Sequence, residues 1–178
     1  RLGVKKDNLL MVDSKGILTT KRSKNGELNQ YKDEFARDVA DGNLEKAMKN
    51  CDLFLGLSKG GIVSKKMVKS MAEKPLIFAL ANPDPEILPD DVLDVRGDAI
   101  VATGRSDYPN QINNVLGFPY IFRGALDVRA TEITENMKMA ATHAIADLAK
   151  EAVPDDVAAA YEGEQIQFGP DYIIPKPF

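Results

Sequence analysis

The sequence has little of several features that would place it in a special class. It contains one cysteine, Cys51, so no internal disulfide can form, and a reducing, cytoplasmic setting is expected. No stretch approaches the roughly 18 consecutive apolar residues that a membrane span needs. The 23 Lys and Arg are interspersed with 27 Asp and Glu, for a net charge of −4, which argues against a nucleic-acid partner. Nothing at the start of the given sequence resembles a charged-then-apolar signal sequence.

The rest of the composition is that of an ordinary soluble domain. Of the 178 residues, 44% are hydrophobic and 28% are charged, which suits one domain with a tail. The chain begins at Arg1 without a methionine, and Gly3 before an apolar run resembles a helix end that enters a strand. The chain stops in the extended stretch 173–178. Both ends are therefore expected to be interior points of a longer protein.

Short apolar runs predict the strands of one sheet. Each is too short for a buried helix, is followed by polar residues, and alternates with segments of helical spacing. The runs are residues 9–12, 52–57, 75–81 and 99–102. This order predicts an α/β fold with a doubly wound, Rossmann-like parallel sheet, in which the carboxyl ends of the strands share one rim. A long helix capped by Thr131 is expected to run to about residue 151.

Ligands of such sheets bind beyond the carboxyl ends of the strands, so the polar residues there are the candidate site. Asp13 follows the first run; it can accept hydrogen bonds from both hydroxyls of an adenosine ribose, or it can begin a turn. The Gly-rich turn expected about 20 residues upstream of such an aspartate is absent. Ser58 lies in the glycine-rich segment 56–61, which fits either a weak nucleotide-contacting loop or an ordinary turn.

Amide side chains gather after the third and fourth runs. Asn82 comes directly before Pro83, so its amide either faces a ligand over the rim or belongs to a turn. The segment 104–114 is rich in amides, including Asn113 and Asn114, and leads into an apolar stretch. Several amides beside an apolar wall suit the recognition of a small polar ligand.

No residue of the chain is expected to act as a nucleophile, a general base or a metal ligand. His143 lies off the apolar stripe of the long helix and is expected to be exposed. Cys51 has no evident basic partner and suits a small core position. The aspartate pairs at 90–91 and 155–156 are explained by the preference for negative charge at helix starts.

Several strings of residues together resemble bacterial malic enzymes. They include Ala-Leu-Ala-Asn-Pro-Asp-Pro-Glu-Ile at 79–87 and Asn-Asn-Val-Leu-Gly-Phe-Pro at 113–119. The segments 12–16, 102–111 and 122–128 are also similar to that family, so the likeness covers essentially the whole chain. The resemblance points to the carboxyl-terminal part of these enzymes, the dinucleotide-binding domain.

The resemblance implies an enzyme that oxidatively decarboxylates L-malate to pyruvate and carbon dioxide, with hydride transfer to NAD or NADP and help from a divalent metal, Mg or Mn. Asp13 would then lie near the adenosine ribose, and Ser58 would line the dinucleotide groove. Asn82 would contact the nicotinamide side and the substrate, Asn113 the nicotinamide ribose, and Asn114 the malate. These amides would orient the substrate and would not transfer protons.

The same resemblance implies which parts this chain does not carry. The family's acid–base pair, its metal ligands, the first strand and the Gly-rich turn are all expected upstream. Residues 1–162 would form an incomplete NAD(P)-binding domain, and 163–178 an extended tail. The isolated chain is therefore expected to be poorly stable and catalytically inactive, and its partners would be the upstream substrate domain and further copies of the same enzyme.

Two choices stay open at this point. Asp13 suits a free ribose and hence NAD, whereas Lys15, Lys21 and Arg22 could neutralise the 2′-phosphate of NADP. The alternative function is a non-catalytic module that binds a nucleotide or an enzyme subunit. A third possible function is that of another hydroxy- or amino-acid dehydrogenase with the same fold, and the Asn-Asn-Val-Leu-Gly-Phe-Pro string argues against it.

Overall fold

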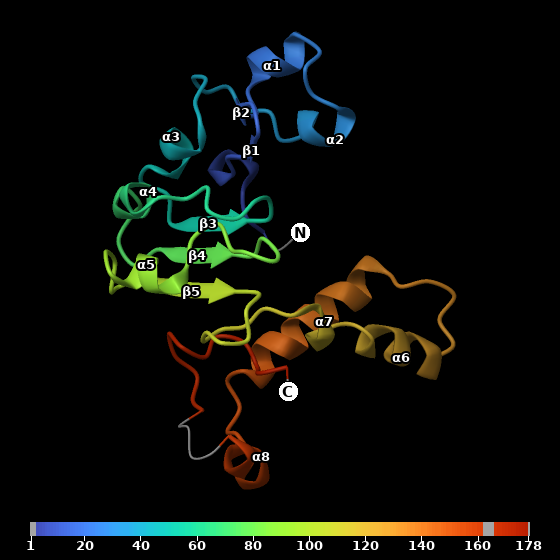
Figure 1. Cartoon of the computed structure of the whole chain (residues 1–178). Coiled ribbons are helices and arrows are strands. Elements are labelled where there is room, and N and C mark those ends of the chain that lie inside the picture. The colour runs from blue at the N-terminus through green and yellow to red at the C-terminus, as the bar shows by residue number, and fades with distance from the viewer. Residues whose placement is uncertain (1–2, 162–165, 178) are drawn as a thin grey trace.

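Three of the four apolar runs form one parallel sheet. In a computed structural model, which describes residues 3–161 and 166–177, β3 (Leu53–Gly56), β4 (Leu76–Ala79) and β5 (Ile100–Thr103) pair side by side in chain order. Leu53 is the register partner of Leu76, which in turn is the partner of Ile100. The carboxyl ends of all three strands point to the same side of the molecule (Figure 1). The predicted α/β, Rossmann-like parallel sheet is confirmed.

Short helices cover one face of this sheet and enclose the core with it. They are α3 (Leu44–Met48), α4 (Lys65–Lys69) and α5 (Pro89–Leu93). The Ser64 hydroxyl oxygen accepts a hydrogen bond from the backbone N–H of Met67 and so caps α4, as expected from its position. Fully buried core side chains include Val68, Ile77 and Val92, one each from α4, β4 and α5.

The opposite face of the sheet is open at β3. Leu53 and Leu55 point to that face, and they are 48% and 53% exposed. The next residue but one, Leu57, is 73% exposed. A doubly wound sheet has helices on both faces, whereas the described residues cover β3 on one face only.

The first apolar run does not join this sheet, which corrects the expectation of a parallel strand covered on both faces. β1 (Val12–Asp13) instead pairs antiparallel with β2 (Gly16–Ile17) in a two-stranded hairpin. The turn forms because Asp13 Oδ1 accepts a hydrogen bond from the backbone N–H of Lys15, at 3.0 Å. Met11 is consequently 43% exposed.

The segment around the hairpin carries three short helical turns. They are η1 (Lys6–Asn8), α1 (Thr20–Lys24) and α2 (Gln30–Asp33). Together with the hairpin they lie beyond β3, on the side of the sheet away from β5 (Figure 1). Gly16 has a φ of +111°, and a Cβ there would lie 2.4 Å from the Gly42 carbonyl oxygen, so this turn requires glycine.

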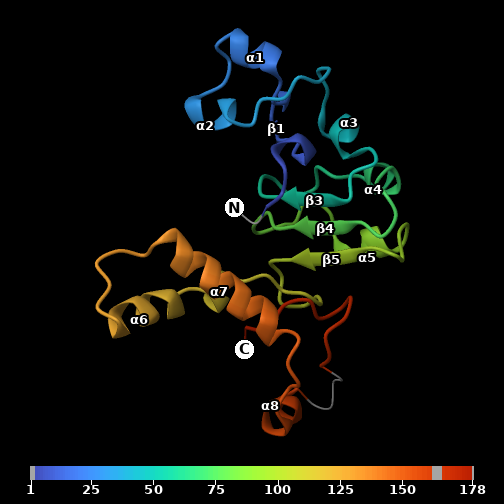
Figure 2. The ribbon, with the colours of Figure 1, turned by 180° about the vertical axis from the view of Figure 1, so that it is seen from behind.

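The elements after β5 extend away from the core. They are η2 (Asn114–Leu116), α6 (Tyr120–Asp127), α7 (Glu135–Leu148) and α8 (Asp155–Ala160). α7 begins later than expected, because the Thr134 hydroxyl, and not that of Thr131, accepts the capping hydrogen bond from Met137 N–H at 3.2 Å. α6 and α7 lie against each other beyond β5, which the view from behind also shows (Figure 2).

The last described segment, 166–177, returns to the end of β5. Its residues Gly169 and Tyr172 form an isolated antiparallel bridge. The predicted boundary between domain and tail, at 162, falls outside the described residues and stays a prediction. No helix among residues 3–161 and 166–177 combines the length and the apolar character needed to cross a membrane.

Candidate functional site

Ser58 and Asn82 lie just beyond the carboxyl ends of neighbouring parallel strands. Ser58 follows β3 and Asn82 follows β4, and both residues are exposed. Neither side chain forms a hydrogen bond with any other residue that the structure describes. Both side chains are therefore free to bind a ligand at the edge of the sheet, where ligands of parallel sheets bind.

A buried carboxylate joins the backbones of these two strand ends. Glu86 is 0% exposed. Its Oε1 accepts a hydrogen bond from the N–H of Ser58 at 2.9 Å, and its Oε2 accepts one from the N–H of Ala81 at 3.0 Å. The sequence pattern alone did not single out Glu86. The available signal was Gly56, because a glycine at the end of a strand indicates the close approach of another group.

Asp13 lies in the β1–β2 hairpin and is surrounded by positive charge. Its Oδ1 accepts from Arg22 Nη1 at 3.0 Å and its Oδ2 from Arg22 Nη2 at 3.1 Å, which is the paired geometry of a strong ion pair. Oδ2 also accepts from Lys32 Nζ at 2.8 Å. With the turn hydrogen bond from Lys15 N–H, both oxygens are fully engaged.

These bonds hold the Asp13 carboxylate in its charged form. The Arg22 guanidinium lowers the pKa of Asp13 well below its usual range, and Lys32 and the Lys15 N–H add to this, against the opposing effect of burial. The side chains of Asp13 and Arg22 are only 15% and 9% exposed, so salt screens this pair weakly. The sequence left two roles open for Asp13, a contact with the adenosine ribose or the start of a turn. Within the described chain Asp13 forms the turn.

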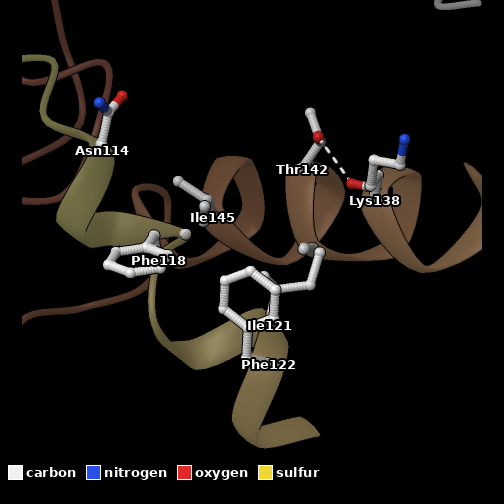
Figure 3. A pocket seen from close by; sticks show the side chains of 9 residues that line it. Asn114, Phe118, Ile121, Phe122, Lys138, Thr142 and Ile145 are labelled. Atoms are coloured by element: carbon white, nitrogen blue, oxygen red, sulfur yellow. Dashed lines mark hydrogen bonds between the residues drawn. The ribbon is translucent and has the colours of Figure 1, made fainter. Parts of the chain in front are cut away.

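Asn113 and Asn114 lie at the start of η2, beyond β5. The Asn113 side-chain oxygen accepts a hydrogen bond from Val115 N–H at 3.0 Å, so it caps this helical turn. The Asn114 side chain is exposed and has no hydrogen bond to the described part of the chain. It stands at one end of an open groove between α6 and α7, of about 520 Å³ (Figure 3).

The groove beside Asn114 is mainly apolar. Phe118 and Phe122 form one wall, with their rings edge to face at a centroid distance of 5.4 Å. Ile145 and Thr142 of α7 form the other wall, and Lys138 lies at the end away from Asn114 (Figure 3). A polar amide beside such a wall can orient a small polar molecule while the wall limits access of water.

The loop before Asn113 is held by its own charges. Arg105 donates from Nε and Nη2 to the two carboxylate oxygens of Asp107, at 2.9 and 2.6 Å. The Arg105 guanidinium also lies over the ring of Tyr108, 5.4 Å from its centroid. Asp107 raises the pKa of Arg105 further, which keeps it charged. These contacts shape the segment that leads from β5 to the candidate amides.

The predicted site residues thus fall into a row and do not form one tight cluster. Asp13 lies beyond β3, Ser58 and Asn82 lie at the carboxyl edge of the sheet, and Asn113 and Asn114 lie beyond β5 (Figure 1). An elongated ligand suits such a row better than a compact one.

The residues with reactive or metal-binding side chains lie elsewhere. His143 is exposed on α7, as expected. The Cys51 thiol donates a hydrogen bond to the Ala47 carbonyl oxygen, and burial raises its pKa, so it is a poor nucleophile. Among the residues described, no group of three or more His, Cys, Asp or Glu could hold a metal ion.

Comparison with known families decides the relationship of the chain. A family model described as "Malic enzyme, NAD binding domain" matches residues 4–161. The chain belongs to the malic enzyme family. This confirms the relationship suggested by the strings at 79–87 and 113–119, and it identifies the matched part as the NAD-binding domain of that family.

Curated malic enzymes match nearly the whole chain. It is 56% identical over 177 residues to the NADP-dependent malic enzyme of Rhizobium meliloti (strain 1021), which covers 99% of this chain and 23% of that protein. It is 53% identical to the NADP-dependent malic enzyme of Halomonas elongata, over 98% of this chain and 41% of that protein. The NAD-dependent malic enzyme of Rhizobium meliloti is 48% identical. The chain therefore spans about a quarter to two fifths of the length of these relatives.

Solved malic enzyme structures share the fold. The NAD-dependent malic enzyme of Thermotoga maritima matches with a TM-score of 0.80 and 40% identity, over 99% of this chain and 42% of that one. The malic enzyme of Pyrococcus horikoshii matches with a TM-score of 0.73 and 38% identity, over 94% and 36%.

The residues of this malic enzyme domain fit a dinucleotide but not a divalent metal. Two exposed polar side chains without partners, Ser58 and Asn82, lie at the carboxyl edge of the sheet, while Lys15 lies in the β1–β2 turn and Lys32 of α2 pairs with Asp13 of the hairpin. Hydroxyl, amide and ammonium groups suit ribose and phosphate. The described residues offer no comparable set of metal ligands.

Proposed function

We propose that this chain binds NADP and orients L-malate for oxidative decarboxylation to pyruvate and carbon dioxide. The family match over residues 4–161 carries this proposal, because the matched domain is the one that binds the dinucleotide. When bound, NADP would supply the acceptor for the hydride that leaves C2 of malate. The base that takes the hydroxyl proton, and the acid that protonates the enolate left when carbon dioxide departs, are expected elsewhere in the enzyme. The partners are malate, the remainder of the enzyme and further copies of it, in a cytoplasmic setting.

The residues of this chain bind and orient, and the proton transfers belong to groups elsewhere in the enzyme. Ser58 and Asn82 offer a hydroxyl and an amide at the sheet edge for the sugar hydroxyls of the dinucleotide. Asn113 and Asn114, which lie beyond β5, are the candidates for the nicotinamide ribose and malate. Holding the reacting atoms in one geometry is worth several orders of magnitude in rate, and this is the contribution that amides can make. The metal, Mg or Mn, is expected on upstream residues.

The surroundings of Asp13 favour NADP over NAD. To accept hydrogen bonds from a free ribose, Asp13 would have to release donors that already engage both of its oxygens. A 2′-phosphate at the same place would meet a neutralised carboxylate, with Lys32, 42% exposed, and the exposed Lys15 beside it. Relatives with 51–56% identity are named NADP-dependent malic enzymes, in agreement with this choice.

Calorimetric titration with NADP and NAD tests the choice, using the longest natural polypeptide that contains this sequence. We expect the dissociation constant for NADP to be lower than that for NAD. Lys32→Gln should weaken NADP binding about tenfold, because a charge-assisted contact is lost, and should leave NAD binding unchanged or tighter. Lys24→Gln, which changes an exposed lysine of α1, is the matched control. Tighter binding of NAD by the wild type would contradict the proposed cofactor.

Malate-dependent formation of NADPH by the same polypeptide tests the reaction. Binding of NADP without any turnover of malate would favour a non-catalytic nucleotide-binding module. The isolated 178 residues are expected to show no turnover, because the acid–base and metal groups are expected upstream.

A further inference from the structure

We propose that Glu86 is a positioning residue that sets the spacing of the two loops carrying Ser58 and Asn82. The inference rests on the proposed function, because it takes these loops as the walls of the dinucleotide site. Glu86 itself is fully buried, so it acts through the backbone and does not touch the ligand.

The carboxylate spans the ends of two neighbouring strands. One oxygen accepts from Ser58 N–H, immediately after the Leu57 that follows β3, at 2.9 Å. The other accepts from Ala81 N–H, one residue before Asn82, at 3.0 Å. The backbone that carries the two candidate side chains is thus held by one shared group. A shift of the carboxylate moves both of them.

The end of the sheet is built to admit this carboxylate. Gly56, Ala79 and Thr103 are register partners in the last row of the sheet; Ala79 and Thr103 have small side chains, and Gly56 has none. A Cβ at Gly56 would lie 2.3 to 2.6 Å from the carboxylate atoms of Glu86. The absence of a side chain at Gly56 is therefore what allows the acid to lie across β3.

Further backbone contacts make the two loops one unit. Gly61 N–H donates to the Pro85 carbonyl oxygen, and Val63 N–H donates to the Glu86 carbonyl oxygen, both at 3.0 Å. A Cβ at Gly60 would lie 2.7 Å from the Asp84 carbonyl oxygen, so these segments approach closely along their length. Glu86 takes part in this contact between the loops twice, through its side-chain oxygens and through its backbone carbonyl oxygen.

Stability alone does not account for a carboxylate in this position. Among the ion pairs of the described residues none includes Glu86, so its two partners are neutral N–H groups. A buried acid without a cation is costly compared with an apolar side chain of similar size. What its two bonds provide is a defined distance between two loops, which is what an elongated ligand lying across both strands requires.

Glu86→Gln tests the inference with the smallest change of shape. The amide keeps one acceptor oxygen and directs an NH2 group at one of the two N–H donors, so one bond is lost. We expect the dissociation constant for NADP, measured by calorimetry on the longest natural polypeptide, to rise about tenfold. Glu132→Gln, at an exposed site in the connection between α6 and α7, is the matched control and should change nothing.

A double-mutant cycle separates positioning from a merely structural role. If Glu86 acts by placing Asn82, then Glu86→Gln should weaken NADP binding much less in an Asn82→Ala background than in the wild type. Gly56→Ala, which displaces the same carboxylate without changing its chemistry, should reproduce the loss of affinity. Equal effects of Glu86→Gln in both backgrounds, or unchanged affinity of a folded Glu86→Gln variant, would overturn the inference.

The outcome is distinguishable from failure of the proposed function. If the wild-type polypeptide binds neither NADP nor NAD, the proposed function fails. If the wild type binds and the cycle shows no coupling between Glu86 and Asn82, only the positioning role fails. Thermal unfolding of each variant shows that the measured polypeptides are folded.

Discussion

Asn113 and Asn114 are neighbours in the sequence, but their amides are used differently. The Asn113 oxygen caps η2 through Val115 N–H, so part of its hydrogen-bonding capacity is already used within the chain. Asn114 has no hydrogen bond within the described chain and stands at the end of the groove between α6 and α7. Of the two, Asn114 is therefore the better candidate for direct contact with malate.

Asn114→Ala is expected to lower the turnover of malate far more than the affinity for the dinucleotide. The amide orients the substrate, and small losses of alignment cost up to about 100-fold in rate. Steady-state kinetics with malate and calorimetry with NADP measure the two effects separately. Asn136→Ala, an exposed asparagine on α7, is the control. Unchanged kinetics would remove Asn114 from the site.

Sequence patterns identified which residues face the edge of the sheet but not what surrounds them. Asp13 was recognised as polar and close to a strand, yet its partners Arg22 and Lys32 lie 9 and 19 residues further along the chain. Glu86 was overlooked because nothing in the run 79–87 distinguishes a buried acid from a surface one. Contacts between loops depend on the packed strands, which local periodicity does not describe.

At the scale of elements, one asparagine links the loop after β5 to the last described segment. Asn110 is 6% exposed and has a φ of +55°. Its Nδ2 donates to the carbonyl oxygens of Val101 and Pro170, at 2.9 and 2.7 Å, and its Oδ1 accepts from Ile173 N–H at 2.9 Å. This single side chain thus holds the tail against β5, directly before the candidate amides.

Asn110→Ala is expected to release the tail and to destabilise the fold by about 1–3 kcal/mol, because buried polar groups of the backbone lose their partners. Hydrogen exchange at the Ile173 amide and urea unfolding measure the two effects. Asn50 has a similar φ of 59° and is exposed, so Asn50→Ala reports the strain of that backbone conformation alone. Equal costs for both substitutions, with Ile173 still protected, would show that the side-chain bonds contribute little.

The strands were more predictable than the first hairpin for a physical reason. Three of the apolar runs became β3, β4 and β5, since a run with polar residues at its end suits a buried parallel strand. The run at 9–12 has the same pattern, but in the described chain it has no parallel neighbour. The turn from Asp13 to Gly16 pairs it locally instead. Periodicity specifies an element type, and the available neighbours decide where it pairs.

At the scale of the whole molecule, the open face of β3 is the feature that the described residues leave unexplained. Leu53, Leu55 and Leu57 are each about half exposed or more. Parallel sheets are normally covered on both faces. Because the chain spans 23% of the length of one relative and 42% of one solved malic enzyme, we expect the remainder of the enzyme to cover this face.

This expectation predicts different costs for one substitution in two polypeptides. In the isolated 178 residues Leu55 is 53% exposed, so Leu55→Ala should change the free energy of unfolding by no more than about 0.5 kcal/mol. In the longest natural polypeptide, where Leu55 is expected to be covered, Leu55→Ala should lower the free energy of unfolding by about 2–5 kcal/mol. Leu93→Ala is the control: Leu93 ends α5 and is 48% exposed, and it should cost little in either polypeptide. Urea unfolding of each polypeptide measures the change in the free energy of unfolding for both substitutions. The same small cost for Leu55→Ala in the two polypeptides would mean that this face stays open, and that the remainder of the enzyme packs elsewhere.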